Sequence, residues 1–507
     1  MKRILFFLVI ISGFLPKSNA QDITDALRYS TENIIGTARF NALGGAFGTL
    51  GGDLSAISIN PAGSAVFLKN AASVSLNISD VTNKASYFST KSNVNFTNTD
   101  FNQAGFVFVF NTNNQESDWN KFTVGLNFET SQNFDQNLFV KGVGDTSIGD
   151  FFVQQAQGVP LDLLQLQGGE TISDLYSYLG ENFGTSYQNA FLGYQGFIFD
   201  PVDANDTENT LYTLTIAGGD FNQEYSFITR GFNAKYSFNL ATQYRKKLYF
   251  GINLNSHTID YLQYTFLEEH NNNNGSTVNY VGFENTLQVL GNGFSAQAGI
   301  IAKITPEFRV SATYNTPTWL TISEETTQYL ETNRISGSTN ILTTVNPNVV
   351  NLFKDYKLQT PGKLSAGIAY VFGSRGLVSL NYEYKDYSKS KFKPQTESYF
   401  ATQNTLIGNT LKATSTIRFG GEYKYERWSF RGGLRFEESP YKDNNVVGDT
   451  TVLSTGVGYD FGGISVDVSY SNISQTRNQQ LYNIGLTSTS AIDSKTSTFV
   501  LTLGYNL

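Results

Sequence analysis

The chain has 507 residues, and its 43 acidic and 35 basic side chains give a formal net charge of −8. This acidity argues against a nucleic-acid partner, because such partners are held by basic surfaces. The chain has no cysteine and only two histidines, so disulfides, thiol chemistry and cysteine- or histidine-rich metal sites are not expected. We therefore expect no cofactor and no metal site.

The first 20 residues have the pattern of a secretory signal peptide. Lys2 and Arg3 precede an apolar run from Ile4 to Leu15, and Ser18-Asn19-Ala20 is a small-residue cleavage site. No later stretch reaches the ~18 consecutive apolar residues of a membrane-spanning helix. We expect an exported chain that, if it crosses a membrane, does so with strands.

Residues 21–70 form a separate unit ahead of the first strand. The glycine pairs in this unit are not a phosphate-binding loop, because no Gly-Lys-Ser/Thr follows them and no strand–helix unit surrounds them. Three short motifs occur in order: Arg39 with Gly44-Gly45-Ala46-Phe47, then Asp53-Leu54-Ser55-Ala56, then Asn60-Pro61-Ala62-Gly63. In the last motif Pro61 fixes φ, Gly63 permits a tight bend and Asn60 can hydrogen-bond the turn backbone.

From residue 71 onward, apolar and polar residues alternate in paired segments, as in half-buried strands. The expected strands are Ala72–Tyr87, Gln103–Phe110, Phe122–Phe128, Tyr236–Tyr244, Leu248–Phe266, Phe294–Lys303, Phe308–Tyr314, Leu364–Val371, Leu377–Lys385, Thr416–Tyr425, Arg427–Phe436, Val452–Asp460, Gly463–Ser471 and Ser497–Leu507. Short turns join the pairs, and long polar linkers separate them: 131–229, 267–291, 315–362, 387–414, 437–450 and 472–496.

This alternation of short turns and long linkers is typical of an outer-membrane barrel, whose turns are periplasmic and whose loops are extracellular. The even count of about fourteen strands fits a single-chain bacterial barrel. We therefore predict an all-β membrane protein, an antiparallel transmembrane β-barrel over residues 71–507. An array of soluble β-sandwiches is the alternative, since composition alone does not separate lipid-facing from core-facing strands.

The longest linker, residues 131–229, contains a helical pattern. Thr171 to Asp174 resembles a capping box, and apolar residues follow it at helical spacing. Two interpretations stay open: these side chains pack on one another to fold the loop, or they form a surface groove that collects an apolar ligand. The candidate ligand contacts are Leu164, Leu175, Leu179 and Phe183.

The last strand has apolar residues at every odd position from Phe499 to Leu507. This pattern predicts the closing strand of the barrel, with lipid on one face and the lumen on the other. Its end is a candidate signal for the barrel-assembly machinery. Tyrosines near several strand ends fit an interfacial aromatic girdle. The expected location is the bacterial outer membrane.

The three motifs of residues 36–66 resemble the start of the FadL/TodX family of outer-membrane channels for hydrophobic compounds. In that family R-x-x-(A/G)-x-G-G-A-(F), D-x-S-A and N-P-A-G occur in this order. The resemblance implies a barrel of the strand number counted above, with residues 21–70 as a hatch in its lumen and with large, partly helical extracellular loops. The hatch or gating residues would be Arg39, Gly44, Gly45, Asp53, Ser55, Asn60, Pro61, Ala62 and Gly63.

The resemblance also implies passive transport of a hydrophobic small molecule, such as a long-chain fatty acid or an aromatic hydrocarbon. Extracellular loops would capture the ligand, a lumenal pocket would hold it and hatch movement would release it, in studied relatives sideways through a gap in the wall. For a carboxylate head group we expect Arg418, Arg431 and Arg435, which share the lumen-facing parity of two neighbouring strands. These arginines could instead pair with lumenal acids such as Glu383 and Glu422.

Other functions are weaker candidates. A receptor or adhesin that does not transport, or a haem-binding barrel, remains the alternative, although two histidines are few for haem ligation. An enzyme is not expected, since no G-x-S-x-G is present. The expected partners are a hydrophobic ligand, outer-membrane lipid, lipopolysaccharide and the assembly machinery, with no nucleic acid, and we expect a monomer.

Overall fold

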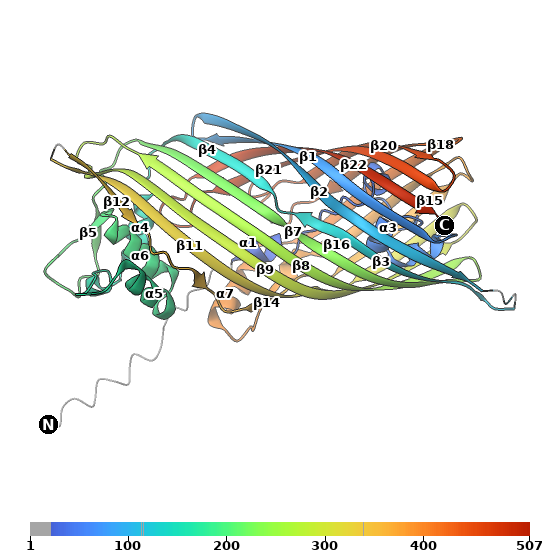
Figure 1. Ribbon diagram of the computed structural model, residues 1–507, viewed down its shortest axis with the longest axis horizontal. Helices are drawn as coiled ribbons and strands as arrows, with labels where there is room; N and C mark the ends of the chain where they lie inside the picture. The colour runs from blue at the N-terminus through green and yellow to red at the C-terminus, as the bar shows by residue number, and fades with distance from the viewer. Residues whose placement is uncertain (1–21, 113, 115, 338, 507) are drawn as a thin grey trace, which may run out of the picture.

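The computed structural model describes residues 22–112, 114, 116–337 and 339–506. The expected signal peptide lies outside the described residues. The described chain forms a long antiparallel β-barrel with helices inside it and at one end (Figure 1). Among these residues no helix is both long and apolar enough to cross a membrane.

The barrel wall has 14 strands, three of which are built from two segments in line: β3 with β4, β10 with β11, and β14 with β15. The strands are β1 (Ala71–Tyr87), β2 (Thr90–Asn111), β3 (Trp119–Asn133), β4 (Gln136–Gly144), β7 (Phe221–Tyr244), β8 (Leu248–His270), β9 (Val278–Lys303), β10 (Phe308–Asn315), β11 (Trp319–Ser336), β14 (Tyr356–Gln359), β15 (Lys363–Val371), β16 (Gly376–Asp386), β18 (Ala413–Tyr425), β19 (Trp428–Glu437), β20 (Thr450–Asp460), β21 (Ile464–Gln480) and β22 (Thr489–Asn506). Pairing of β22 with β1 closes the barrel.

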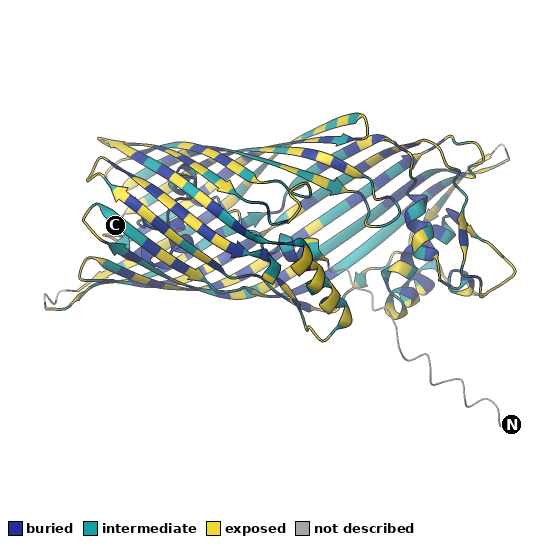
Figure 2. Ribbon diagram, turned by 180° about the vertical axis from the view of Figure 1, so that it is seen from behind, coloured by how far each residue is buried: buried dark blue, intermediate teal, exposed yellow. Residues whose placement is uncertain are grey.

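Burial alternates along the wall strands, as Figure 2 shows. On β22 the outward residues Phe499, Leu501 and Leu503 are about half exposed, whereas Val500 and Thr502 are buried on the inner side. Large apolar side chains thus face outward, which is the pattern of a wall in contact with lipid. The predicted barrel and its strand number are confirmed.

Several expected loops are wrong, because the strands are longer than the apolar pattern suggested. Residues 267–291 and 315–362 were expected as loops, but most of the first belongs to β8 and β9, and the second contains β11. The expected linker 472–496 is likewise mostly β21 and β22. A strand needs only ~9–11 residues to cross a bilayer, so these strands extend well beyond it on the side opposite the short turns.

Shorter elements lie between the wall strands. Helices α4 (Gly149–Ala156), α5 (Ile172–Asn182) and α6 (Thr185–Gln195) gather at the end of the barrel away from the C-terminus, and we call residues 145–220 the cap (Figure 1). The remaining elements are η2 (Leu161–Leu163), β5 (Phe199–Pro201), β6 (Tyr212–Leu214), β12 (Thr339–Val345), β13 (Asn351–Leu352), η3 (Tyr387–Lys389), β17 (Lys391–Lys393) and α7 (Ser398–Thr410). The predicted capping box is present: Thr171 and Asp174 cap α5 reciprocally.

Residues 22–70 lie within the barrel. Within this N-terminal unit, expected above as the hatch, we keep the name hatch for residues 37–70 only. The N-terminal unit contains α1 (Ile23–Arg28), α2 (Ala38–Ala42), α3 (Leu54–Ile59) and η1 (Pro61–Val66). The sequence motifs supply the caps of these short helices: Asp53 caps α3 and Asn60 caps η1. Apolar hatch residues, including Leu43, Phe47 and Ile57, are fully buried.

Candidate functional site

The hatch is tied to the wall by an ion-pair chain that begins at Arg39. The Arg39 guanidinium donates to Glu422 on β18 through Nε (2.8 Å to Oε2) and Nη2 (3.2 Å to Oε1). Glu422 also accepts from Arg431 on β19 at 2.7 Å, and Arg431 in turn pairs with Asp467 on β21. One carboxylate is therefore shared by a hatch cation and a wall cation, so it joins the hatch to three wall strands.

The remaining motif residues hold the hatch together. Asp53 accepts hydrogen bonds from the Thr37 hydroxyl at 2.9 Å and from the Ser55 amide at 2.9 Å. The Ser55 hydroxyl accepts from the Thr37 amide at 2.8 Å. Asn60 donates to the Gly48 carbonyl within the hatch at 2.8 Å and to the Ile300 carbonyl of the wall at 3.2 Å. These contacts give the motif a folding and anchoring role, and Pro61, Ala62 and Gly63 are buried beside them in η1.

Glycines let the hatch backbone approach the wall backbone. Gly44 has φ +60°, a conformation that favours glycine. On the inner face, a Cβ added to Gly433 would lie 2.3 Å from the Gly44 nitrogen, and one added to Gly420 would lie 2.5 Å from the Leu43 oxygen. Gly45 also has positive φ, +75°, and lies against the side chain of Arg418. Any side chain at Gly433 would push the hatch away from β19.

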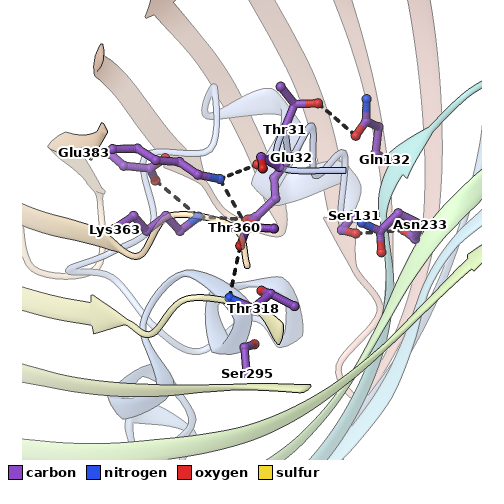
Figure 3. Close-up of polar contacts among 12 residues, drawn as sticks. Thr31, Glu32, Ser131, Gln132, Asn233, Ser295, Thr318, Thr360, Lys363 and Glu383 are labelled. Atoms are coloured by element: carbon purple, nitrogen blue, oxygen red, sulfur yellow. Dashed lines mark hydrogen bonds and ion pairs between the residues drawn. The ribbon is translucent and has the colours of Figure 1, made fainter. Parts of the chain in front are cut away.

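An extended segment above the hatch crosses the lumen, and we call residues 29–36 the strap (Figure 3). On one side Glu32 pairs with Lys363 of β15 at 2.8 Å, and Lys385 donates to the Ser30 carbonyl. On the other side the Asn33 amide donates to the Ser131 carbonyl of β3 at 2.7 Å. The strap is thus held from two separate parts of the wall.

Lysines determine the charge state of the strap carboxylate. Burial would raise the pKa of Glu32, but Lys363, Lys385 and Lys235 outweigh burial and hold this pKa well below its ordinary value. Glu32 is therefore ionised, and its attachment to the wall is an ion pair.

The three arginines proposed for a ligand carboxylate all lie on the inner side of the wall. Arg418 pairs with Glu383 at 3.1 Å, and Arg431 is held between Glu422 and Asp467. Arg435 donates to the Asn33 side chain of the strap at 2.7 Å. The geometry thus favours the ladder with lumenal acids over a carboxylate site at Arg418 and Arg431.

The apolar loop residues are placed in the core of the cap. Leu164 and Leu179 are fully buried and Leu175 is 5% exposed. Phe183 packs against this cluster and stacks on Tyr187 with ring centroids 4.8 Å apart. Their burial favours the interpretation that these side chains fold the loop.

The wall has a break in its backbone pairing between β2 and the third wall strand. The pairing of β2 with β3 ends where Gln103 lies opposite Glu129. Beyond this point β2 pairs with neither β3 nor β4, and β4 pairs only with β7. The third strand is interrupted at Phe134 and Asp135. Side chains bridge the break: Asn98 donates to Asp135 at 3.3 Å, and Asn133 donates to Asp100 at 2.7 Å.

A lumenal cavity of about 490 Å³ lies beside this break. Its lining includes Arg28 of α1, Thr31 and Asn33 of the strap, and the interrupted segment from Gln132 to Gln136. The strap thus separates the cavity from the hatch. Sequence patterns did not identify the cavity, the break or Glu32; the run Asn133-Phe134-Asp135, which interrupts an otherwise alternating strand, is the one local signal for the break.

Comparisons with known proteins agree with this architecture. Solved structures similar to the chain include a Pseudomonas aeruginosa FadL homologue (13% identity, 94% of this chain and 98% of that chain covered, TM-score 0.53). They also include the Pseudomonas putida toluene transporter TodX (14% identity, 94% and 99% covered, TM-score 0.49) and the Ralstonia pickettii toluene transporter TbuX (16%, 94% and 99%, TM-score 0.46). No curated protein sequence matches.

The family described as "Outer membrane protein transport protein (OMPP1/FadL/TodX)" matches residues 203–507, more than half of the chain. This range comprises β7 to β22 and does not include the hatch motifs, so it supports the assignment independently of them. The chain therefore belongs to the OMPP1/FadL/TodX family of outer-membrane channels for hydrophobic compounds.

Proposed function

We propose that the protein passively carries hydrophobic small molecules, such as long-chain fatty acids or aromatic hydrocarbons, from the cell surface into the outer membrane. The cavity beside the strap holds the ligand, and the break between β2 and β4 is its sideways exit. The main support is the position of the cavity, whose lining includes both edges of the break, at Asn98 and Asp100 and at Asn133 and Asp135.

Release through the break fits the physical chemistry of an apolar solute. Phe101 on β2 is 45% exposed on the outer face, whereas the next outward residues, Thr99 and Thr97, are polar. The break therefore lies at the upper edge of the apolar band, so a ligand leaving there enters the outer leaflet without crossing periplasmic water. The side-chain hydrogen bonds across the break are fewer than a strand ladder would have, and they can be replaced by water.

Hatch movement is the second element of the proposal. The hatch is held by the Arg39–Glu422 pair and the strap by the Glu32–Lys363 pair. Both contacts join a short N-terminal segment to the rigid wall, so their rupture would enlarge the cavity downward without unfolding the barrel.

A cross-link across the break tests the exit route. The chain has no cysteine, so Asn98→Cys with Asp135→Cys can be joined specifically by dibromobimane. The matched control is Val74→Cys with Leu503→Cys, which are directly opposite in the intact wall between β1 and β22. We expect uptake of a labelled long-chain fatty acid or alkylbenzene to fall only for the first pair.

Two results would count against the proposal. Unchanged uptake after cross-linking the break would exclude sideways release there. Absence of uptake of both compounds by the unmodified protein would exclude transport of fatty acids and of alkylbenzenes.

A further inference from the structure

The lumenal cavity has two chemically different walls. One wall is made by β1, β2 and β22 and presents amide and hydroxyl side chains, including Asn77, Ser79, Asn83, Asn98, Thr496 and Thr498. A cavity built only for hydrocarbon would be lined by apolar side chains with few polar groups. This wall is instead a hydrogen-bonding surface.

The other part of the lining is apolar and aromatic. It contains Leu27 of α1, Phe134 at the strand interruption, Tyr261 of β8 and Tyr441 of the loop after β19. The Phe134 and Tyr261 rings meet edge to face, with centroids 5.3 Å apart at 83°. This wall continues into a buried apolar cluster around Tyr29 and Ile259.

Acceptor atoms on the polar wall lack donors. Asn77 and Asn83 are each 1% exposed, and the side-chain oxygens of Asn77, Asn83 and Asn98 have no hydrogen-bond partner among the described residues. The amide nitrogens of the same side chains are used, for example by Asn83 towards the Asn137 carbonyl at 2.7 Å. Buried carbonyl oxygens without a donor are unfavourable, so this wall is suited to a group that brings O–H or N–H donors.

The charge of the lining argues against an anionic ligand. Four carboxylates, those of Asp100, Asp135, Glu437 and Glu438, line the cavity, and none of them has an ion-pair partner among the described residues. Of the two guanidiniums in the lining, Arg28 is paired with Asp25 and lies over the Tyr261 ring at 4.3 Å. The other, Arg477, offsets at most one of the four carboxylate charges. A fatty-acid carboxylate would therefore meet net negative charge at short range.

We infer that this cavity binds an uncharged amphiphile, with a hydroxyl- or amide-rich end on the β1–β2–β22 wall and an apolar end on Phe134, Tyr261 and Tyr441. This inference rests on the proposed function, because it names the substrate class of the same cavity. The ligand would then leave with its apolar end beside the break and its polar end among the polar side chains above the apolar band.

Equilibrium binding to the full chain in lipid nanodiscs tests the inference. The probes are n-octyl β-D-glucoside, octanoate and toluene, titrated calorimetrically below their aggregation concentrations. We expect the glucoside to bind at least about tenfold more tightly than octanoate or toluene. Equal or tighter binding of octanoate or toluene would overturn the inference.

Variants assign the binding to the polar wall. Asn77→Leu should weaken glucoside binding about tenfold and leave toluene unchanged, and Asn77→Ser should recover part of the loss. The matched control is Asn93→Leu, an exposed position on β2, which should change neither. The shift on heating in SDS gels shows whether Asn77→Leu is folded as a barrel. A folded Asn77→Leu variant with unaltered glucoside binding would also refute the assignment.

The uptake assay separates this inference from the proposed function. If toluene or fatty acid enters through the protein but the glucoside does not bind, the inference fails alone. If the glucoside binds as expected but none of the three probes is transported, the proposed transport fails and the cavity is a binding site only.

Discussion

The Arg39–Glu422 pair gives a quantitative prediction for hatch anchoring. Arg39→Ala removes two charge-assisted hydrogen bonds, at 2.8 and 3.2 Å, from a carboxylate whose side chain is 1% exposed. Loss of a bond to a charged group costs about 1.5–3 kcal/mol. Complete loss of charge compensation would cost more, but Arg431 still neutralises Glu422. At 1.4 kcal/mol per factor of ten, the hatch should detach roughly 10- to 100-fold more often.

A cysteine in the hatch reports this detachment. Ala46 is fully buried and the chain has no other cysteine, so the labelling rate of Ala46→Cys with maleimide should follow the detached population. Adding Arg39→Ala should raise the rate by that factor, and Arg39→Lys should give an intermediate rate because one ion pair survives. The control is Arg245→Ala, since the Arg245–Asp118 pair is 63% and 47% exposed at its side chains and contributes little. Equal labelling of Arg39→Ala and the parent would refute the reasoning.

Three further predictions use the same cysteine-free background. Because the pKa of Glu32 is lowered, the strap should be fully attached above the ordinary value of 4.5 and should detach as pH falls through the lowered value. A spin label at Ile35→Cys should therefore stay immobile from pH 8 to about 5 and become mobile only in stronger acid, whereas with Glu32→Gln it should be mobile throughout. A label that is equally immobile in Glu32→Gln would contradict the ion-pair account. Gly433→Ala should destabilise the attached hatch by about 1–3 kcal/mol and so raise the labelling rate of Ala46→Cys. Gly432→Ala should leave this rate unchanged, because a Cβ there meets nothing nearer than the Ser454 oxygen at 4.0 Å. Equal labelling rates for the two variants would argue against direct backbone contact. Glu269 accepts hydrogen bonds from the Ile148 amide at 2.8 Å and the Gln223 side chain at 2.7 Å. Glu269→Leu should therefore loosen the start of α4 and speed chymotryptic cleavage of the cap, while the labelling rate of the hatch cysteine is unchanged. Cleavage no faster than in the parent would exclude this anchoring role of Glu269.

Strand positions within the apolar band were predictable from the sequence, and strand lengths were not. In β22 the outward residues change from Phe499 to Ser497 and Lys495 as the strand leaves the band. Above that point both faces of the wall meet water, the cap or polar neighbours, so the period-two pattern disappears. The same reason hid β11, whose outward residues include the polar Ser323 and Glu325.

Local site chemistry was predictable, whereas contacts across the lumen were not. Parity placed Arg418 and Arg431 inside the barrel and identified Glu383 and Glu422 as partners, and these ion pairs are present. The third member of the Glu422 cluster, Arg39, lies 383 residues away in sequence. No periodicity relates the two, because the contact depends on where the hatch sits in the closed barrel. The break beside Phe134 likewise depends on how β2 and β4 diverge in space.

The closing seam of the barrel is also in contact with the hatch. At the seam the Thr502 hydroxyl of β22 contacts the Ser75 hydroxyl of β1 at 2.8 Å and accepts from the Ala38 amide of the hatch at 2.7 Å. The first and last wall strands therefore meet at a residue that the hatch also contacts. A slip of one residue would turn Thr502 to the other face of the sheet. The Ala38–Thr502 bond therefore helps to specify the register of the seam, and a chain lacking the hatch would lose this constraint.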